Sequence, residues 1–94
     1  MVSIAKATEN AIKFARDALG PVRTAAVRLE EVASTEVNGK DTWVITLSMI
    51  NPDDPLNSPI GAALGRGRRE YKSFTVLKDS GEVTSMKIRE LADA

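Results

Sequence analysis

The sequence predicts a single α+β domain in which an N-terminal helix packs on a four-stranded antiparallel β-sheet. Three observations lead to this prediction. Residues 4–19 have helical spacing of apolar positions, a strand pair joined by Asn38-Gly39 follows, and a second strand pair ends the chain. The strands are expected to follow one another as a meander, with a long loop between the second and the third. A length of 94 residues fits one domain, 1–94, with one modest core.

The helix is expected over about residues 4–19. Ser3 is a suitable N-cap, and Gly20-Pro21 is a typical stop because a left-handed residue is followed by one that cannot continue the helix. The expected apolar stripe consists of Ile4, Thr8, Ala11, Ile12, Ala15 and Leu19, with Ala7 and Ala18 at its margins. Since nothing else covers the sheet, the stripe is interpreted as its cover rather than as a partner-binding face.

The first two strands are expected at about 23–37 and 41–50. The alternation of the first changes phase near Glu30-Glu31, which suits a β-bulge. Asn38-Gly39 is a strong hairpin signal, because both residues tolerate a positive φ. The second strand alternates cleanly, and its apolar side consists of Trp43, Ile45, Leu47 and Met49. We interpret Trp43 as a core residue.

The last two strands are expected at about 70–78 and 82–89, around a loop of Asp79, Ser80 and Gly81. If Gly81 takes the left-handed conformation that ends a three-residue loop, the register follows. The covered side then pairs Phe74 with Met86, Val76 with Thr84 and Lys72 with Ile88, and the wet side includes Tyr71 opposite Arg89. Phe74, Met86 and Ile88 are therefore expected in the core.

The loop of residues 51–69 is the expected contact surface for a partner. It holds three prolines and three glycines without strand alternation, and long loops in small domains are commonly functional or disordered. The candidate partner-binding residues are Asp53, Asp54, Arg66, Arg68, Arg69 and Tyr71. Plainer interpretations stay open: Pro-Asp-Asp-Pro is first of all a turn, and the arginines can be solvated charges that discourage strand-edge association.

Composition argues against an enzyme. The chain has no cysteine and no histidine, which excludes disulfides and thiolate sites and removes the commonest general base and metal ligand. Two adjacent carboxylates are too few for a calcium loop, and the glycines of residues 61–67 lack the Gly-Lys-Ser/Thr ending of a phosphate loop. No catalytic residue, metal or cofactor is predicted.

Charge and hydropathy limit the partners further. Thirteen basic residues balance thirteen acidic ones, so no nucleic-acid binding is predicted. No apolar run approaches the length of a membrane span. The N-terminus shows no signal peptide, which favours the cytoplasm, although a removed signal would leave no trace. The sequence does not determine the oligomeric state.

The pattern resembles PepSY and PepSY-like domains. The matching residues are the alanine-rich helix ending in Leu19-Gly20, the strand residues Val27 and Leu29, the run 43–47, and the run 71–76 before the turn at 80–83. Ser80 stands where the family often has threonine, and the 51–69 loop is additional. The gas-vesicle accessory proteins of the O type share the tryptophan strand and final hairpin, but their arginine- and tyrosine-rich ending is missing.

The resemblance implies a cystatin-like outline and a non-catalytic inhibitory or regulatory role, with peptidases as the suggested partner class. We therefore expect a small protein-interaction module that binds a partner protein through the 51–69 loop. The alternative is a small-ligand-binding domain with an apolar pocket between helix and sheet, near Trp43 and Phe14.

Overall fold

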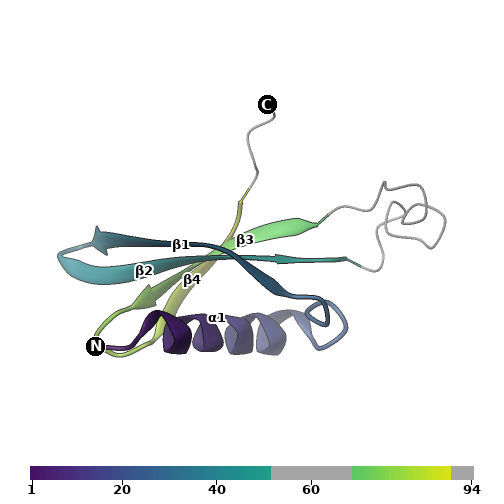
Figure 1. Cartoon of the computed structure of the whole chain (residues 1–94), viewed down its shortest axis with the longest axis horizontal. Helices are drawn as coiled ribbons and strands as arrows, with labels where there is room; N and C mark the ends of the chain where they lie inside the picture. Colours follow the sequence, from purple (N-terminus) through teal and green to yellow (C-terminus); the bar gives the residue numbers. More distant parts are fainter. Residues whose placement is uncertain (52–68, 90–94) are drawn as a thin grey trace.

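A computed structural model of the chain describes residues 1–51 and 69–89. It contains one helix, α1 (Ile4–Leu19), and four strands, β1 (Arg28–Val37), β2 (Lys40–Met49), β3 (Glu70–Leu77) and β4 (Val83–Ile88). The strands form one antiparallel sheet in the order β1-β2-β3-β4, and α1 lies across one face of it (Figure 1). The predicted fold class, a helix on a four-stranded antiparallel meander, is confirmed. Within the described residues, no helix is both long and apolar enough to cross a membrane.

The ends of α1 follow from the expected capping chemistry. The Ser3 side chain accepts a hydrogen bond from the Lys6 amide at 3.1 Å, as an N-cap does. Gly20 has φ +90° and its amide donates to the Arg16 carbonyl at 2.9 Å, which ends the helix. Ala7, Ala11 and Ala15 are completely buried against the sheet. The buried stripe thus includes Ala7, which was expected only at its margin, and leaves out Ile4, which is 46% exposed. The small alanine side chains let α1 lie close to the strands.

The core lies between α1 and the covered face of the sheet. Its buried members are three alanines of α1 and the side chains from the two central strands: Ala7, Ala11, Ala15, Ile45, Leu47, Met49, Phe74 and Val76. Trp43 is half-buried beside them, under the ammonium group of Lys78, whose Nζ lies 4.0 Å from the ring centroid. Trp43 Nε1 also donates to the Val2 carbonyl at 3.3 Å, so this side chain has a structural role.

Strand β1 begins at Arg28, five residues later than the expected start near 23. Residues 21–26 form turns instead. The Thr24 hydroxyl donates to the Gly20 carbonyl at 2.9 Å, and the Val27 amide donates to the Thr24 carbonyl at 3.2 Å. These local bonds compete with strand pairing and hold the turn against the helix end. The expected bulge is present, since the β1–β2 register shifts between Leu29 and Glu31.

The final hairpin has the expected register over most of its length. Phe74 pairs with Met86, and Lys72 with Ile88. Gly81 has φ +78°, as expected, but Leu77 and Glu82 close the loop, since the Leu77 amide donates to the Glu82 carbonyl at 2.9 Å. The loop therefore holds residues 78–81, one more than expected. Val76 pairs with Val83 instead of Thr84, and a register shift next to this pair restores the predicted pairing beyond it.

The expected burial of Ile88 is wrong, because 77% of this residue is exposed. Ile88 ends β4, and Figure 1 shows β4 diverging from α1 toward the C-terminal end of the strand. The sheet twist carries the edge strand away from a helix that can cover only the middle of the sheet. Ile88 thus lies on the helix side of the sheet without a helix above it.

Candidate functional site

The face of the sheet opposite α1, called the open face below, carries a layer of hydrogen-bonded polar side chains. Alternation along β2 directs Thr42, Val44, Thr46 and Ser48 to this face, because Ile45, Leu47 and Met49 pack on the helix side. Within residues 1–51 and 69–89, no helix or further strand covers the open face. Thr46 and Ser48 are nevertheless 2% and 0% exposed. Both hydroxyls form hydrogen bonds with other side chains on this face.

Ser48 is the centre of the first group on the open face. Its hydroxyl donates to Glu30 Oε1 at 2.7 Å and accepts from Arg69 Nε at 2.7 Å. Arg69 Nη2 also donates to the Ser48 carbonyl at 3.1 Å and to the Ala26 carbonyl. Arg28 Nε lies 2.5 Å from Glu30 Oε1. This group joins β1, β2 and the residue before β3, so Arg69 is held by three bonds to neutral oxygen atoms.

Thr46 is the centre of the second group. Its hydroxyl accepts from Arg89 Nη1 at 2.8 Å, and the same nitrogen lies 3.2 Å from Glu31 Oε2. The Ser73 hydroxyl is 3.5 Å from the Thr46 hydroxyl. The Arg89 amide donates to the Tyr71 carbonyl at 2.8 Å, which extends the ladder of β3 and β4 by one residue. The two groups together join β1, β2 and β3 with the residue directly after β4.

Counted over residues 1–51 and 69–89, the charge of this end of the open face is positive. Strand alternation adds Lys87, which pairs with Ser73 and is exposed. Four basic side chains then stand against two acidic ones: Arg28, Arg69, Lys87 and Arg89, with Glu30 and Glu31. The ion pairs of Arg28 and Arg89 account for both carboxylates. Neither Arg69 nor Lys87 forms a direct ion pair with a carboxylate among the described residues, although the charge of Arg69 also lowers the pKa of the Glu30 carboxyl.

The pKa of the Glu30 carboxyl lies below its ordinary value, because Arg28 and then Ser48 donate hydrogen bonds to the carboxylate. The same contact raises the pKa of Arg28. A carboxyl whose pKa is lower in the folded than in the unfolded chain stabilises the fold above its unfolded pKa. That contribution is lost as the pH falls through the folded pKa.

We therefore expect Glu30→Gln to lower the acid sensitivity of folding. The free energy of unfolding of the wild type should fall more than that of the variant between about pH 7 and about pH 3, a range that brackets carboxyl titration. The difference should be small, because the Arg28 side chain is 59% exposed and water screens the pair. Urea unfolding at the two pH values measures it, with Glu9→Gln on α1 as the control. Parallel pH dependence of wild type and Glu30→Gln would contradict the assignment.

The structure describes two of the six predicted site residues. Arg69 and Tyr71 lie on the open face, both next to Ser48, since Tyr71 pairs with Ser48 in the β2–β3 register. Asp53, Asp54, Arg66 and Arg68 lie outside the described residues. Lys72 lies on the opposite face from Arg69, because it pairs with Leu47. Two of the six candidate residues, Arg69 and Tyr71, thus lie on one face of the sheet.

Several residues of the polar layer were missed by the sequence analysis, notably Glu30, Glu31, Thr46 and Ser48. The polar side of the second strand was visible as an alternation, and it signalled an uncovered face. Glu30 could not be assigned to a face, because the bulge decides which way it points.

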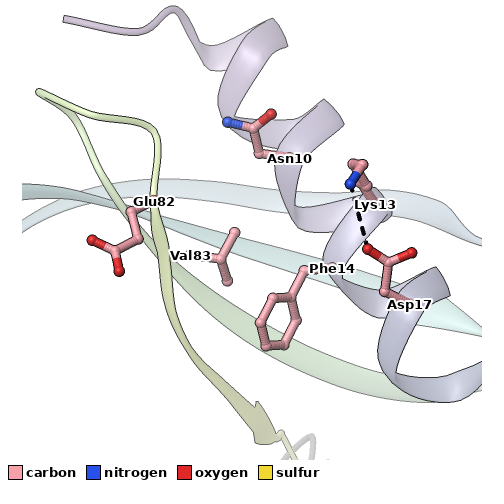
Figure 2. Close-up of a pocket in the computed structure, with 6 residues that line it drawn as sticks. All are labelled: Asn10, Lys13, Phe14, Asp17, Glu82 and Val83. Atoms are coloured by element: carbon pink, nitrogen blue, oxygen red, sulfur yellow. Dashed lines mark hydrogen bonds and ion pairs between the residues drawn. The ribbon is translucent and has the colours of Figure 1, made fainter.

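A second feature is a groove between α1 and the start of β4, called the α1–β4 groove below. Its volume is about 290 Å³, and Figure 2 shows its six lining residues: Asn10, Lys13, Phe14, Asp17, Glu82 and Val83. Phe14 is 37% exposed and packs edge-on against Phe74, with ring centroids 6.3 Å apart and planes at 78°. Lys13 Nζ lies 3.5 Å from Asp17 Oδ2 on the helix side.

Among the described residues, no three side chains of His, Cys, Asp or Glu lie together in a way that could hold a metal ion. No family model matches the sequence, and neither the curated proteins nor the solved structures include a match. The PepSY resemblance therefore stays a prediction, and the function has to be argued from the surfaces described above.

Proposed function

We propose that this chain is a non-enzymatic protein-interaction module that binds a partner protein through the open face of its sheet. The observation that carries the proposal is the fixed, positively charged polar layer around Ser48 and Thr46. This surface lies where Arg69 and Tyr71, two of the residues predicted from the sequence, are found. It extends the predicted contact surface of residues 51–69 onto the sheet.

Two features of the layer suit recognition of a protein surface. The guanidinium groups of Arg69 and Arg89 are held in place, Arg69 by hydrogen bonds to Ser48 and to the Ala26 carbonyl. Arg89 donates to Thr46 and forms an ion pair with Glu31 of β1. Arginines already fixed in place lose less side-chain entropy on binding than free ones. The layer therefore offers oriented N–H donors on a face that no helix covers within the described part of the chain.

The charge of the layer indicates the chemistry of the partner. Because the basic side chains of this end outnumber its carboxylates among the described residues, and Lys87 is exposed, an acidic partner surface would complement it. Arginine binds a carboxylate through two parallel hydrogen bonds, which adds orientation to charge. A regulatory or inhibitory role toward a peptidase, implied by the PepSY resemblance, is the form of partner binding that we favour.

Charge reversal of Lys87 should test this proposal. Lys87→Glu changes an exposed side chain of the open face, so partner binding should weaken about tenfold or more while the midpoint of unfolding stays within about 2 °C. Wild-type binding should also weaken as salt is raised, because exposed charges are screened. Quantitative pull-down from the native host, with isotope-labelled wild type and variant compared, measures both effects.

Arg16→Glu is the matched control, since Arg16 is an exposed basic residue on α1, far in the fold from the open face. The proposal requires that Arg16→Glu keep the captured partners that Lys87→Glu loses. Equal capture by both variants, or equal loss, would reject the open face as the binding surface.

Among the residues that the structure describes, the alternative, a small-ligand-binding domain, is supported by the α1–β4 groove. The predicted pocket near Trp43 and Phe14 is divided in the fold, because Phe14 lines this groove and Trp43 does not. Trp43 is instead held by Lys78 and Val2. A groove of about 290 Å³ that opens along a strand edge is better shaped for one side chain of a protein than for an enclosed ligand.

A further inference from the structure

The α1–β4 groove lies beside a free edge of the sheet. Strand β4 is the last in the order β1-β2-β3-β4, so among the described residues its outer edge pairs with no strand. The Arg89 amide donates to Tyr71 of β3, and amides alternate along a strand. The amides of Met86 and Ile88 therefore point outward, away from β3. They can pair with an added strand.

The helix side of this edge is apolar. Phe14 of α1 and Val83 of β4 line the groove. Further along β4, Met86 is half-buried and Ile88, the last residue of the strand, is 77% exposed. Figure 2 shows Phe14 of α1 beside Val83, with Glu82 next to it in the chain. A strand rises about 3.3 Å per residue, so the distance along β4 from Val83 to Ile88 matches a segment of about six residues.

The rim of the groove is acidic on the strand side. Lys13 is paired with Asp17, whereas Glu82 is exposed and forms no ion pair among the described residues. The groove therefore carries one carboxylate in excess, at the end where Val83 begins the strand. A basic side chain near an apolar one would complement it.

The other edge of the sheet has stronger protection against pairing. Strand β1 is interrupted by the bulge between Leu29 and Glu31, and its acidic residues are Glu30, Glu31 and Glu36. Bulges and charges on an edge strand discourage a further strand. On β4 the register shift lies near the turn, and beyond it only Lys87 is charged, on the opposite face from the groove. The fold thus protects one edge more than the other.

We propose that β4 and the α1–β4 groove together bind an extended segment of a partner protein, which pairs with β4 as an added strand. One apolar side chain of this segment occupies the groove against Phe14 and Val83, and a basic side chain near it pairs with Glu82. The main-chain hydrogen bonds of Met86 and Ile88 supply sequence-independent affinity, and the groove supplies selectivity. This surface is distinct from the open face, so either proposal can fail without the other.

A displayed library of random peptides of about ten residues, long enough to pair along β4, is the probe. Selection on the intact protein should enrich peptides with an apolar residue and a lysine or arginine close to it. Amide exchange measured by NMR should slow at Met86 and Ile88 when a selected peptide binds, because their outward amides become hydrogen-bonded. Selected peptides that leave exchange at Met86 and Ile88 unchanged, or a library that yields no binder, would overturn the proposal.

Ile88→Pro removes an outward amide while sparing the ladder with β3, so it should weaken peptide binding at least about tenfold. Ile88→Ala keeps the amide and is its control, with a smaller loss expected. Glu82→Lys should reverse the preference of the selected peptides for a basic residue. This variant still tests the proposal if Ile88→Pro does not fold. Undiminished affinity of folded Ile88→Pro would exclude strand pairing, and an unchanged preference in Glu82→Lys would exclude the charge pairing.

Discussion

Phe74→Ala is expected to lower the free energy of unfolding by about 3–5 kcal/mol, the range for removing a fully buried phenylalanine ring. Phe74 is 0% exposed and pairs with Ile45 on one side and Met86 on the other. Truncation would leave a cavity between α1 and the two central strands, and it would also remove the edge-on ring contact with Phe14. Equilibrium urea unfolding followed by circular dichroism measures the loss.

Phe14→Ala is the control for this prediction, because Phe14 belongs to the same ring pair but is 37% exposed. It should cost clearly less than Phe74→Ala, since part of its surface is in water in the folded state. A loss below about 1 kcal/mol for Phe74→Ala would mean that the ring does not lie in the core. The register of the final hairpin would then be wrong.

Gly81→Ala is expected to lower the free energy of unfolding by about 2–5 kcal/mol, a sum of left-handed backbone strain of about 1–2 kcal/mol and a disturbed, partly buried hydrogen bond of about 1–3 kcal/mol. Gly81 has φ +78° and its carbonyl accepts from Asn10 Nδ2 at 2.9 Å. An added Cβ would lie 2.8 Å from that nitrogen and 3.1 Å from Val2 Cγ1. Thermal and urea unfolding measure the cost.

Gly39→Ala is a matched control, because Gly39 has the same φ of +78° with no atom within 4 Å of the added Cβ. Gly39→Ala should therefore lower the free energy of unfolding only by the cost of the backbone strain. Asn10→Ala in the Gly81→Ala background should recover part of the loss, since the closest atom is then absent. Equal costs at the two glycines would show that the contact between the hairpin loop and α1 does not form.

The sequence predicted the order of elements because each has a strong local signal. Ser3 caps the start of the helix and Gly20 its end, Asn38-Gly39 forms the turn of the first hairpin, and Gly81 belongs to the turn of the second. The pairing of Phe74 with Met86 followed from the loop even though the loop is one residue longer, because a compensating shift near Val76 restores the register. The extra loop residue and the register shift therefore cancel, and the predicted pairs hold from Thr75 and Ser85 onward.

Other features depend on tertiary contacts that local patterns do not encode. The turn around Thr24 competes with strand pairing through a bond to Gly20, so the strand start was set too early. Ile88 fits the covered side by alternation, but burial also requires a helix above it, and the diverging edge strand leaves α1 behind. Alternation predicts on which side of a sheet a side chain lies, but it does not predict whether a helix covers that side chain.

The candidate site was predictable in part. Tyr71 opposite Arg89 followed from the hairpin register, and Arg69 was singled out as a basic residue before the strand. Their meeting with Glu30, Thr46 and Ser48 depends on the bulge in β1 and on the pairing of β2 with both neighbours. These long-range pairings bring together residues far apart in the chain, so no local spacing announces them.

The central claim, that α1 covers one face of the sheet and leaves the other available to a partner, is tested most directly by methyl NMR with a soluble paramagnetic agent. The account predicts strong line broadening for the open-face methyl groups of Ala33, Val44 and Leu77. The methyl groups of Ile45, Val76 and Ala11 should be spared, because they are buried between α1 and the sheet. Equal protection of both sets in the free protein would show that the open face is already covered and would contradict the account.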